Sequence, residues 1–297
     1  MRKSLSTLTT ILIVTINGVI SKKTINNLKK NYRIIIIENN NYNNLKKNFL
    51  RDSKNINIYI QNKNLGFGGG NNVGLKRIKT PYVLMINPDV EISKKNVEKF
   101  EHYSKKISNF SILTAKVKDF DLMINSSLDK ISKYKKFKFK DLDYQNIPWV
   151  PEWCMFCRMD DLKKVKFFDE NYFLYFEGLD LCKRLIQNNK KFYVIKDIDI
   201  THTMAGTSKK LNDKKFLQHW QLRFWHFYWS SFYYHRKYYG YLTSFRIHIT
   251  KLIRFFFKKN FLYFFRKNDY DYLTTKSKFE GILSQIFNRK SSFRIKL

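Results

Sequence analysis

Polar side chains that could do chemistry stand where several apolar runs of this sequence end. The apolar runs cover residues 11–16, 33–37, 56–60 and 82–86. The polar groups are Thr15 and Asn17 at the end of the first run, Glu38 and Asn39 after the second, Asn64 after the third, and Asn87 and Asp89 after the fourth. In an open parallel sheet, ligands bind in the crevice beyond the carboxyl ends of the strands. If the runs are parallel strands, these groups outline one binding crevice.

A glycine-rich segment, 64–72, follows the third run and includes Gly66, Phe67 and Gly68. It is not a dinucleotide fingerprint, because the G-x-G-x-x-G spacing fails at its third glycine and the segment follows the third run rather than the first. Glycine lets a backbone approach a ligand closely, and helix N-termini bind anions. We therefore expect a close approach to a diphosphate or a sugar, followed by a helix from Asn71.

Asp89 stands just after the apolar run 82–86, where core packing explains a carboxylate poorly. An aspartate at this place could be a turn or helix-capping residue. It could equally hold a hard cation against phosphate oxygens, because Mg²⁺ usually needs only one or two protein carboxylates besides the phosphates. The sequence leaves both readings open.

The apolar runs alternate with stretches of helical character at 22–30, 71–78 and 94–106. Continuous apolar strands alternating with helices predict an α/β fold, with a mostly parallel sheet flanked by helices. Further along, we expect strands at 112–117 and 154–158, a basic exposed loop at 130–140 and a helix at 179–188. The apolar run 11–14 is too short for a signal peptide or a membrane span.

The three cysteines are Cys154, Cys157 and Cys182. This small, odd number disfavours a disulfide framework and favours a reducing compartment. Cys154 and Cys157 form a C-x-x-C pair, but they lie in an apolar strand-like run and the chain has no second pair. A closed zinc site needs four ligands, so we interpret the pair as part of a core.

The formal net charge of +33 favours polyanionic partners, although much of it could reflect a general enrichment in Lys and Asn. From Lys209 onward, basic residues outnumber acidic ones strongly and alternate with aromatic clusters. This pattern is typical of helices lying in a membrane interface. The alternative is an ordinary helical cap with solvated lysines. We expect two domains, 1–208 and 209–297, with the second at an anionic membrane surface.

Several motifs in this order resemble family 2 glycosyltransferases with the GT-A fold, especially the rhamnosyltransferase-like branch. They are Val14-Thr15-Ile16-Asn17, Glu38-Asn39, Asn64-Leu65-Gly66-Phe67-Gly68 with Asn71-Asn72-Val73-Gly74, Asn87-Pro88-Asp89-Val90, Phe168-Asp169-Glu170, the run from Phe173 to Arg184, and His202 with Gly206 and Ser208. The resemblance covers roughly residues 10–208.

The resemblance implies a role for each matching residue. Thr15, Asn17 and Glu38 would contact the base and ribose of a nucleotide-sugar donor. Asp89 and His202 would bind a divalent metal, Mn²⁺ or Mg²⁺. The other positions that would bind the nucleotide-sugar are Asn39, Asn64, Gly66, Phe67, Gly68, Asn72 and Asn87.

This chain departs from the family at the position of the catalytic base. The family typically has Glu-Asp where this chain has Glu177-Gly178, and the second carboxylate is the one usually assigned as base. Glycine cannot take a proton, so Glu177 or Asp180 would have to serve. The two stand three residues apart near an expected helix start, where both could face a crevice, although acidic residues are also common there for helix stability.

The resemblance implies an inverting glycosyltransferase that uses a nucleotide-sugar donor. The donor sugar could be a deoxyhexose such as rhamnose. The basic aromatic tail suits a glycan or lipid-linked acceptor of cell-surface polysaccharide synthesis, handled at the cytoplasmic face of the cell membrane. Two alternatives stay open: a nucleic-acid-binding protein, disfavoured because no recognised motif accompanies the charge, and a nucleotidyltransferase built on a similar sheet.

Overall fold

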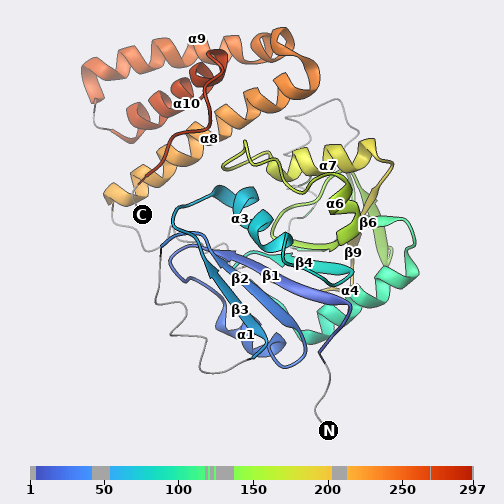
Figure 1. The fold of residues 1–297 in the computed structure, drawn as a ribbon. Coiled ribbons are helices and arrows are strands. Elements are labelled where there is room, and N and C mark those ends of the chain that lie inside the picture. The colour runs from blue at the N-terminus through green and yellow to red at the C-terminus, as the bar shows by residue number, and fades with distance from the viewer. Residues whose placement is uncertain are drawn as a thin grey trace. The chain divides into compact units, whose positions relative to one another are not determined.

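The computed structural model describes residues 5–41, 54–117, 120, 124, 137–202, 213–267 and 269–295. The chain divides into two compact units, shown in Figure 1. The first unit contains Met1–Phe168 and Leu181–Met204. The second contains Asp169–Asp180 and Ala205–Leu297. A short internal segment of the chain therefore belongs to the same unit as the C-terminal helices.

An eight-stranded sheet forms the centre of the described part of the first unit, in the order β3-β2-β1-β4-β8-β6-β9-β7. The strands are β1 (Thr9–Thr15), β2 (Arg33–Glu38), β3 (Ile56–Ile60), β4 (Tyr82–Ile86), β6 (Phe110–Ala115), β7 (Tyr144–Ile147), β8 (Cys154–Arg158) and β9 (Lys191–Ile195). Only β8 and β7 run against their neighbours, so the mostly parallel sheet expected from the sequence is confirmed.

Continuous apolar runs form the central strands because helices cover the sheet and leave little of it in water. In β2, the four isoleucines between Arg33 and Glu38 are all buried. Ile11 to Ile13 of β1 and Val83 to Ile86 of β4 are buried on both sides in the same way. Parallel pairing puts Thr15 of β1 beside Glu38 of β2, at the carboxyl ends of the two strands.

Helices flank the sheet (Figure 1). They are α1 (Lys22–Leu28), α3 (Gly66–Leu75), α4 (Lys94–Lys106), α6 (Met159–Lys164) and α7 (Glu177–Gln187). The starts of α1, α4 and α7 are at or close to the expected positions, whereas α6 was not expected from the sequence. Serine hydroxyls start α1 and α4: Ser21 accepts from the backbone N–H of Thr24, and Ser93 accepts from that of Asn96. Such side-chain caps satisfy N–H groups that have no partner within the helix.

In the glycine-rich segment, the structure corrects the start of the predicted helix. The helix expected from Asn71 begins at Gly66, so the glycines form its first turns rather than a loop before it. Their smallness serves packing, because a Cβ on Gly70 would lie 2.8 Å from Cγ1 of Val14, and one on Gly74 would overlap the side chain of Leu12. Both contacts are with β1, so the glycines bring α3 close to the sheet.

A second, two-stranded sheet joins β5 (Val90–Glu91) to β10 (Thr201–His202). The strands are antiparallel and pair Val90 with His202. Gly206 and Ser208 lie outside the described residues, and so does the part of the expected 130–140 loop before residue 137.

The second unit contains three helices among its described residues: α8 (Asp213–Tyr239), α9 (Tyr241–Arg266) and α10 (Tyr270–Ile286). Gly240, with φ of 83°, makes the turn between α8 and α9, a left-handed conformation that favours glycine. A Cβ on Gly281 of α10 would overlap the backbone carbonyl of Trp225, so this glycine allows α10 to lie close against α8. In the part of the chain that the structure describes, no helix has the length and apolar character to cross a bilayer.

Candidate functional site

Glu38 anchors the loop that follows β1. Its two carboxylate oxygens accept hydrogen bonds from the backbone N–H groups of Asn17, at 3.0 Å, and Gly18, at 2.8 Å. Asn17 and Gly18 both have positive φ, 57° and 70°, so the backbone turns sharply here. The carboxylate therefore fixes a loop conformation that is uncommon for a residue such as asparagine.

Glu38 is fully buried, and this burial changes its acidity. Burial raises the pKa of Glu38 from its ordinary 4.5 to about 6, against backbone hydrogen bonds from Gly18, Asn17 and Asn40 that lower it. The loop is further held by the hydroxyl of Thr15, which donates to the carbonyl of Val19 at 2.6 Å. Thr15, Asn17 and Glu38 thus form one connected group, as the sequence places them.

Asn39 ties the end of β2 to the start of α3. Its amide nitrogen donates to the carbonyl of Gly66 at 2.8 Å and to the side-chain oxygen of Asn64 at 3.1 Å. Its own oxygen accepts from the N–H of Leu65, and the Asn64 oxygen accepts from the N–H of Gly66. Asn39 and Asn64 therefore shape the glycine segment, although sequence reasoning gave them only a ligand-binding role.

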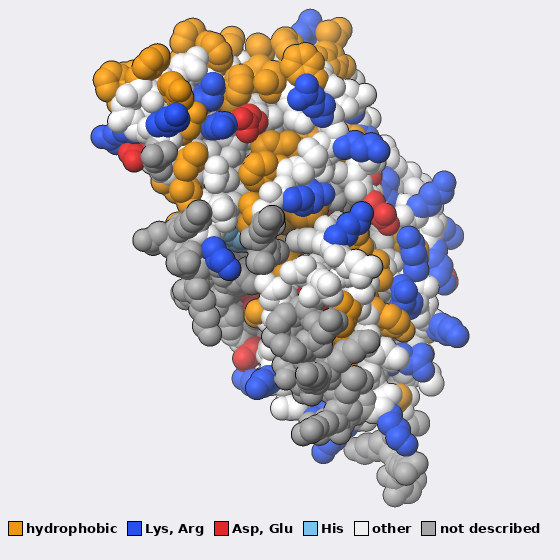
Figure 2. All heavy atoms as spheres, turned by 60° about the vertical axis from the view of Figure 1, so that its left-hand side comes forward, with side chains coloured by type: hydrophobic (Ala, Val, Ile, Leu, Met, Phe, Trp, Pro, Cys, Tyr) orange, Lys and Arg blue, Asp and Glu red, His pale blue; other side chains and the backbone are white. Residues whose placement is uncertain are grey.

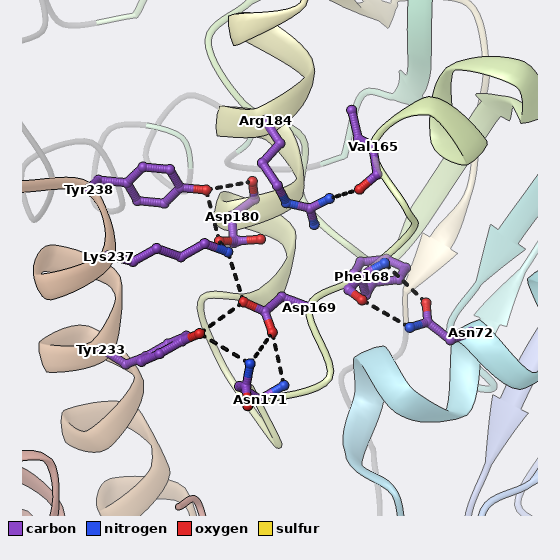
Figure 3. Close-up of polar contacts among 10 residues, drawn as sticks. All are labelled: Asn72, Val165, Phe168, Asp169, Asn171, Asp180, Arg184, Tyr233, Lys237 and Tyr238. Carbon is purple, nitrogen blue, oxygen red and sulfur yellow. Dashed lines mark hydrogen bonds and ion pairs between the residues drawn. The ribbon is translucent and has the colours of Figure 1, made fainter. Parts of the chain in front are cut away.

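Asn72 on α3 also forms hydrogen bonds that hold the backbone of another segment. Its amide donates to the carbonyl of Phe168 at 2.9 Å and accepts from the N–H of Phe168 at 3.0 Å, as Figure 3 shows. Phe67 in the first turn of α3 contacts the ring of Phe168 edge-on. The buried Gly68 lies in the same turn. These contacts join α3 to the end of the segment that precedes the second unit.

Asn87 and Asp89 follow β4 in a tight connection to β5. The N–H of Asn87 donates to the carbonyl of Trp153, and the carbonyl of Asn87 accepts from the N–H of Val90 at 3.1 Å. Asp89 is half-buried, so its side chain is partly open to solvent. Because Val90 pairs with His202, the backbones of Asp89 and His202 lie at neighbouring positions on the β5–β10 pair.

The carboxylate of Asp89 suits a cation that a bound phosphate helps to hold. Among the described residues, no group of three or more His, Cys, Asp or Glu side chains forms a closed metal cage. Mg²⁺ and similar hard ions are commonly held by one or two carboxylates together with substrate phosphates. The carboxylate of Asp89 fits that arrangement.

The first unit thus brings its predicted residues to one edge of its sheet. Thr15, Asn17, Glu38 and Asn39 meet at the ends of β1 and β2, and Asn64, Gly66 and Asn72 are joined to them through α3. Asp89 follows β4, which is the neighbour of β1 on its other side. The expected crevice beyond the carboxyl ends of the strands corresponds to this edge.

Glu177 and Asp180 belong to the second unit and are both buried in the first turn of α7. Asp180 forms an ion pair with Lys237 of α8, at 2.5 Å, and accepts a hydrogen bond from the hydroxyl of Tyr238 at 2.8 Å. Lys237 also pairs with Asp169 at 2.8 Å (Figure 3). Lys237 therefore forms ion pairs with two carboxylates.

Asp169 has a further set of partners. Tyr233 of α8 donates to it at 3.2 Å, and the backbone N–H and side-chain amide of Asn171 also donate to it. Burial opposes the charge of Asp169, but the hydrogen bond from Lys237 and those from Asn171 hold its pKa below the usual value. The charged form of this carboxylate is thus stabilised within the unit.

The whole segment 169–180 lies along one face of α8. Its residues contact α8 side chains at three- and four-residue spacing, which is one side of a helix. The ring of Phe173 packs on His226, the carbonyl of Leu174 accepts from Ser230, and the ring of Phe176 packs on Tyr234. Sequence reasoning missed this role of α8, although the spacing of its polar and aromatic residues was visible.

Two aromatic residues just before α7 have unusual backbone conformations. Tyr175 and Phe176 both have φ of 68°, in the left-handed region that bulky residues rarely adopt. Arg223 of α8 donates to the hydroxyl of Tyr175 at 2.6 Å, and the ring of Phe227 contacts both aromatics. Such backbone strain persists only where the surrounding structure enforces it, and it gathers at functional sites.

The C-x-x-C pair lies in the core, as the sequence indicates. Cys154 and Cys157 are buried on β8, and Cys182 is buried on α7. Burial raises the pKa of the Cys154 thiol to about 12 and that of Cys157 well above its usual value. A thiol that resists ionisation is a poor nucleophile and a poor metal ligand.

Comparison with known proteins shows which family the chain matches. Residues 10–166 match the model of the family described as Glycosyl transferase family 2. The chain is 25% identical over 190 residues to Rhamnosyltransferase WbbL of Escherichia coli (strain K12), covering 54% of this chain and 69% of that protein. It is 23% identical over 153 residues to Low-salt glycan biosynthesis hexosyltransferase Agl10 of Haloferax volcanii, covering 47% of this chain and 49% of that protein.

The fold is also similar to that of a solved structure, mannosyltransferase PcManGT from Pyrobaculum calidifontis in complex with GDP-Man and Mn²⁺. The TM-score is 0.55 at 8% identity, covering 97% of this chain and 90% of that one. At this identity the likeness shows the fold, which is of the GT-A type. The family match spans more than half of the chain and ends just before the second unit begins. The protein therefore belongs to glycosyl transferase family 2.

Proposed function

We propose that this glycosyltransferase moves a sugar, with inversion, from a nucleotide-sugar donor to an acceptor hydroxyl. The observation that carries the proposal is the edge of the first sheet. There the buried Glu38 fixes the loop after β1, and Asp89 follows the neighbouring strand β4. A nucleotide fits the first group and its diphosphate fits the second, because ligands bind beyond the carboxyl ends of parallel strands.

The donor site consists of residues of the first unit. Thr15, Asn17 and Glu38 are assigned to the base and ribose. The remaining donor contacts are assigned to Asn39, Asn64, Gly66, Phe67, Gly68, Asn72 and Asn87. Asp89 and His202 would hold Mn²⁺ or Mg²⁺ against the diphosphate, where such an ion neutralises charge on the leaving group.

The acceptor proton is assigned to a carboxylate of the second unit. In the reaction, the acceptor oxygen bonds to the anomeric carbon, the bond from that carbon to the diphosphate breaks, and the proton passes to the base. Asp180 pairs with Lys237 and accepts from Tyr238, which suits a positioning role. We assign the base to Glu177, which is adjacent in the chain to the position of the usual base.

The names of the relatives support a choice of donor sugar. One relative is a rhamnosyltransferase and the other is a hexosyltransferase of glycan biosynthesis. A hexose or deoxyhexose such as rhamnose is the corresponding donor sugar for this chain. A glycan or lipid-linked acceptor of cell-surface polysaccharide synthesis, met at the inner face of the cell membrane, suits the basic aromatic residues 209–297.

The test is thermal stabilisation of the full chain by dTDP, UDP and GDP, each with and without Mn²⁺ or Mg²⁺. A ligand at a hundred times its Kd stabilises the native state by about 2.7 kcal/mol. We expect one nucleotide to raise the melting temperature in a metal-dependent way, and Asp89→Asn to remove the metal dependence. Asp160→Asn, which changes an exposed carboxylate on α6, should behave as the wild type. If no nucleotide raises the melting temperature, the donor site is wrong.

A further inference from the structure

Helix α9 packs inside the second unit through one face, and a different face exposes large apolar side chains. The inner face carries Ser244, His248 and Leu262, which are buried. His248 is held there by its ring nitrogens, which bond the carbonyl of Ser244 and the hydroxyl of Ser231 on α8. This face explains how α9 is attached to the unit.

The outer face of α9 exposes large apolar side chains. At helical spacing they form a stripe opposite the buried residues. The stripe consists of Leu242 (71% exposed), Ile253 (50%), Phe257 (67%), Phe261 (65%) and Phe264 (79%). We call it the α9 stripe. Figure 2 shows hydrophobic side chains gathered at the top of the view, the region of α9 in Figure 1, with Lys and Arg side chains among them.

Basic side chains lie along α9 together with the apolar ones, and the helix contains no acidic residue. The basic residues of α9 are Arg246, Lys251, Arg254, Lys258, Lys259 and Arg266. The ion pairs of Lys258 and Arg266 with Asp271 and Asp269 are long, 3.9 and 4.0 Å, and exposed. Exposed pairs of this kind are weak, so the positive charge of α9 stays available to a partner.

We infer that the α9 stripe is a docking surface for an anionic lipid bilayer, with the phenylalanines entering the headgroup–acyl boundary and the basic residues contacting lipid phosphates. A helix that combines an apolar face with flanking Lys and Arg binds in this way. The inference rests on the proposed function, because a membrane-bound acceptor gives a reason for docking to a bilayer. The physical argument from the exposed side chains of α9 is independent of that function.

Other occupants fit the surface less well. A second copy of the chain on the same patch would bring the basic residues of two α9 helices together, and like charges facing each other oppose association. A nucleic acid could stack on phenylalanine rings, but Leu242 and Ile253 belong to the same stripe and cannot stack. A bilayer boundary accepts aromatic and aliphatic side chains together with the cations around them.

The experiment measures sedimentation of the full chain with vesicles of phosphatidylcholine, with or without phosphatidylglycerol. We expect binding to the anionic vesicles, weakened as salt shortens the Debye length from ~10 Å at 0.1 M to ~3 Å at 1 M. Phe257→Ser with Phe264→Ser should weaken binding roughly tenfold or more, because two exposed rings lose their burial in lipid. Arg254→Gln with Lys258→Gln should lower binding to anionic vesicles selectively.

Phe287→Ser is the matched control, because Phe287 is 62% exposed in the same unit but lies beyond α10. It should bind vesicles as the wild type does. A label supplies a second readout: the native cysteines are buried, so a solvatochromic dye reacts selectively in Phe264→Cys. Its emission should shift to the blue with anionic vesicles, whereas the same dye in Phe287→Cys should not shift.

Donor-nucleotide stabilisation and unfolding of the Phe257→Ser, Phe264→Ser protein are measured in parallel. If the double variant keeps the wild-type melting temperature and nucleotide stabilisation, its weaker vesicle binding reflects loss of membrane docking and not loss of fold. If the wild-type protein binds vesicles but no nucleotide, only the proposed function is overturned. Wild-type binding by the double variant overturns the inference. The inference is also overturned if the wild-type protein is a dimer that does not bind vesicles and the double variant is a monomer. The α9 stripe is then a self-association interface.

Discussion

At the scale of single residues, Glu38 does more than its position in the sequence suggests. Both of its oxygens accept backbone N–H groups from the turn at Asn17 and Gly18. Protonation would weaken both interactions, because the neutral acid is a poorer acceptor.

This gives a pH dependence for donor binding. Burial raises the pKa of Glu38 to about 6, so the carboxylate is charged above this pH and neutral below it. If only the charged form binds, affinity for the donor nucleotide should fall about fourfold between pH 7.5 and pH 5.5. Isothermal titration calorimetry over this range measures the effect.

Glu38→Gln is the control for this prediction. It should bind more weakly at pH 7.5 and lose less affinity on acidification than the wild type. The terminal phosphate of the nucleotide also titrates near pH 6, but this contribution is common to both proteins and cancels in their ratio. Equal pH profiles for the two proteins would exclude Glu38 as the titrating group.

At the scale of elements, helix α8 organises the segment that carries the proposed base. Lys237 and Tyr238 hold Asp180 at the start of α7, while Ser230 and Phe227 hold the residues just before it. A buried carboxylate whose cationic partner is lost, or a buried cation whose carboxylate is lost, costs several kcal/mol. The family position occupied by Gly178 is thus flanked by one carboxylate that is fixed in place and another, Glu177, that we assign to proton transfer.

The two carboxylates should therefore respond differently to neutralisation. Glu177→Gln is expected to lower kcat by roughly 10²–10⁴, as for loss of a general base. Asp180→Asn is expected to cost about 2 kcal/mol of unfolding free energy, because the charge-assisted hydrogen bonds of Asp180 are weakened while Lys237 keeps its pair with Asp169. Sugar-transfer assays and thermal unfolding measure both effects, with Asp160→Asn as control. Full turnover in Glu177→Gln would remove it as base.

At the scale of the whole molecule, the second unit depends on neutral buried histidines. His226 bonds the carbonyl of Phe293 at 2.8 Å and the hydroxyl of Ser291 at 3.0 Å. A carbonyl only accepts, so that ring nitrogen carries the proton and the other one accepts from the serine. Burial lowers the pKa of His226 to about 3 and that of His248 to about 4.

This arrangement predicts loss of stability in acid. A histidine whose folded pKa is depressed contributes stability that is present above its unfolded pKa of about 6.5 and is lost as pH falls toward the folded value. Each of the two should cost about 2 kcal/mol at pH 5 relative to pH 7. Denaturant unfolding at both pH values measures the difference. His248→Gln should reduce it, and the exposed His102→Gln should leave it unchanged.

Much of the first unit could be predicted from local pattern. The strands at 56–60, 82–86 and 154–158 and the helix at 94–106 have the expected bounds. This succeeds because a buried parallel strand needs a continuous apolar run, and such runs are visible in the sequence. The start of α3 could not be predicted in this way, because its glycines serve close packing on Leu12 and Val14 of β1, which are distant in the chain.

The sequence by itself determined the chemical groups at the strand ends, the alternation that produces the parallel sheet, and the basic aromatic character of the C-terminal residues. Only the tertiary structure decided that residues 169–180 belong with the C-terminal helices, that Lys237 pairs with Asp169 and Asp180, and that α9 keeps one apolar face exposed. The physical reason is that these features depend on contacts between residues far apart in the chain. Periodicity shows that a helix has an apolar face, but not whether protein or another partner covers it.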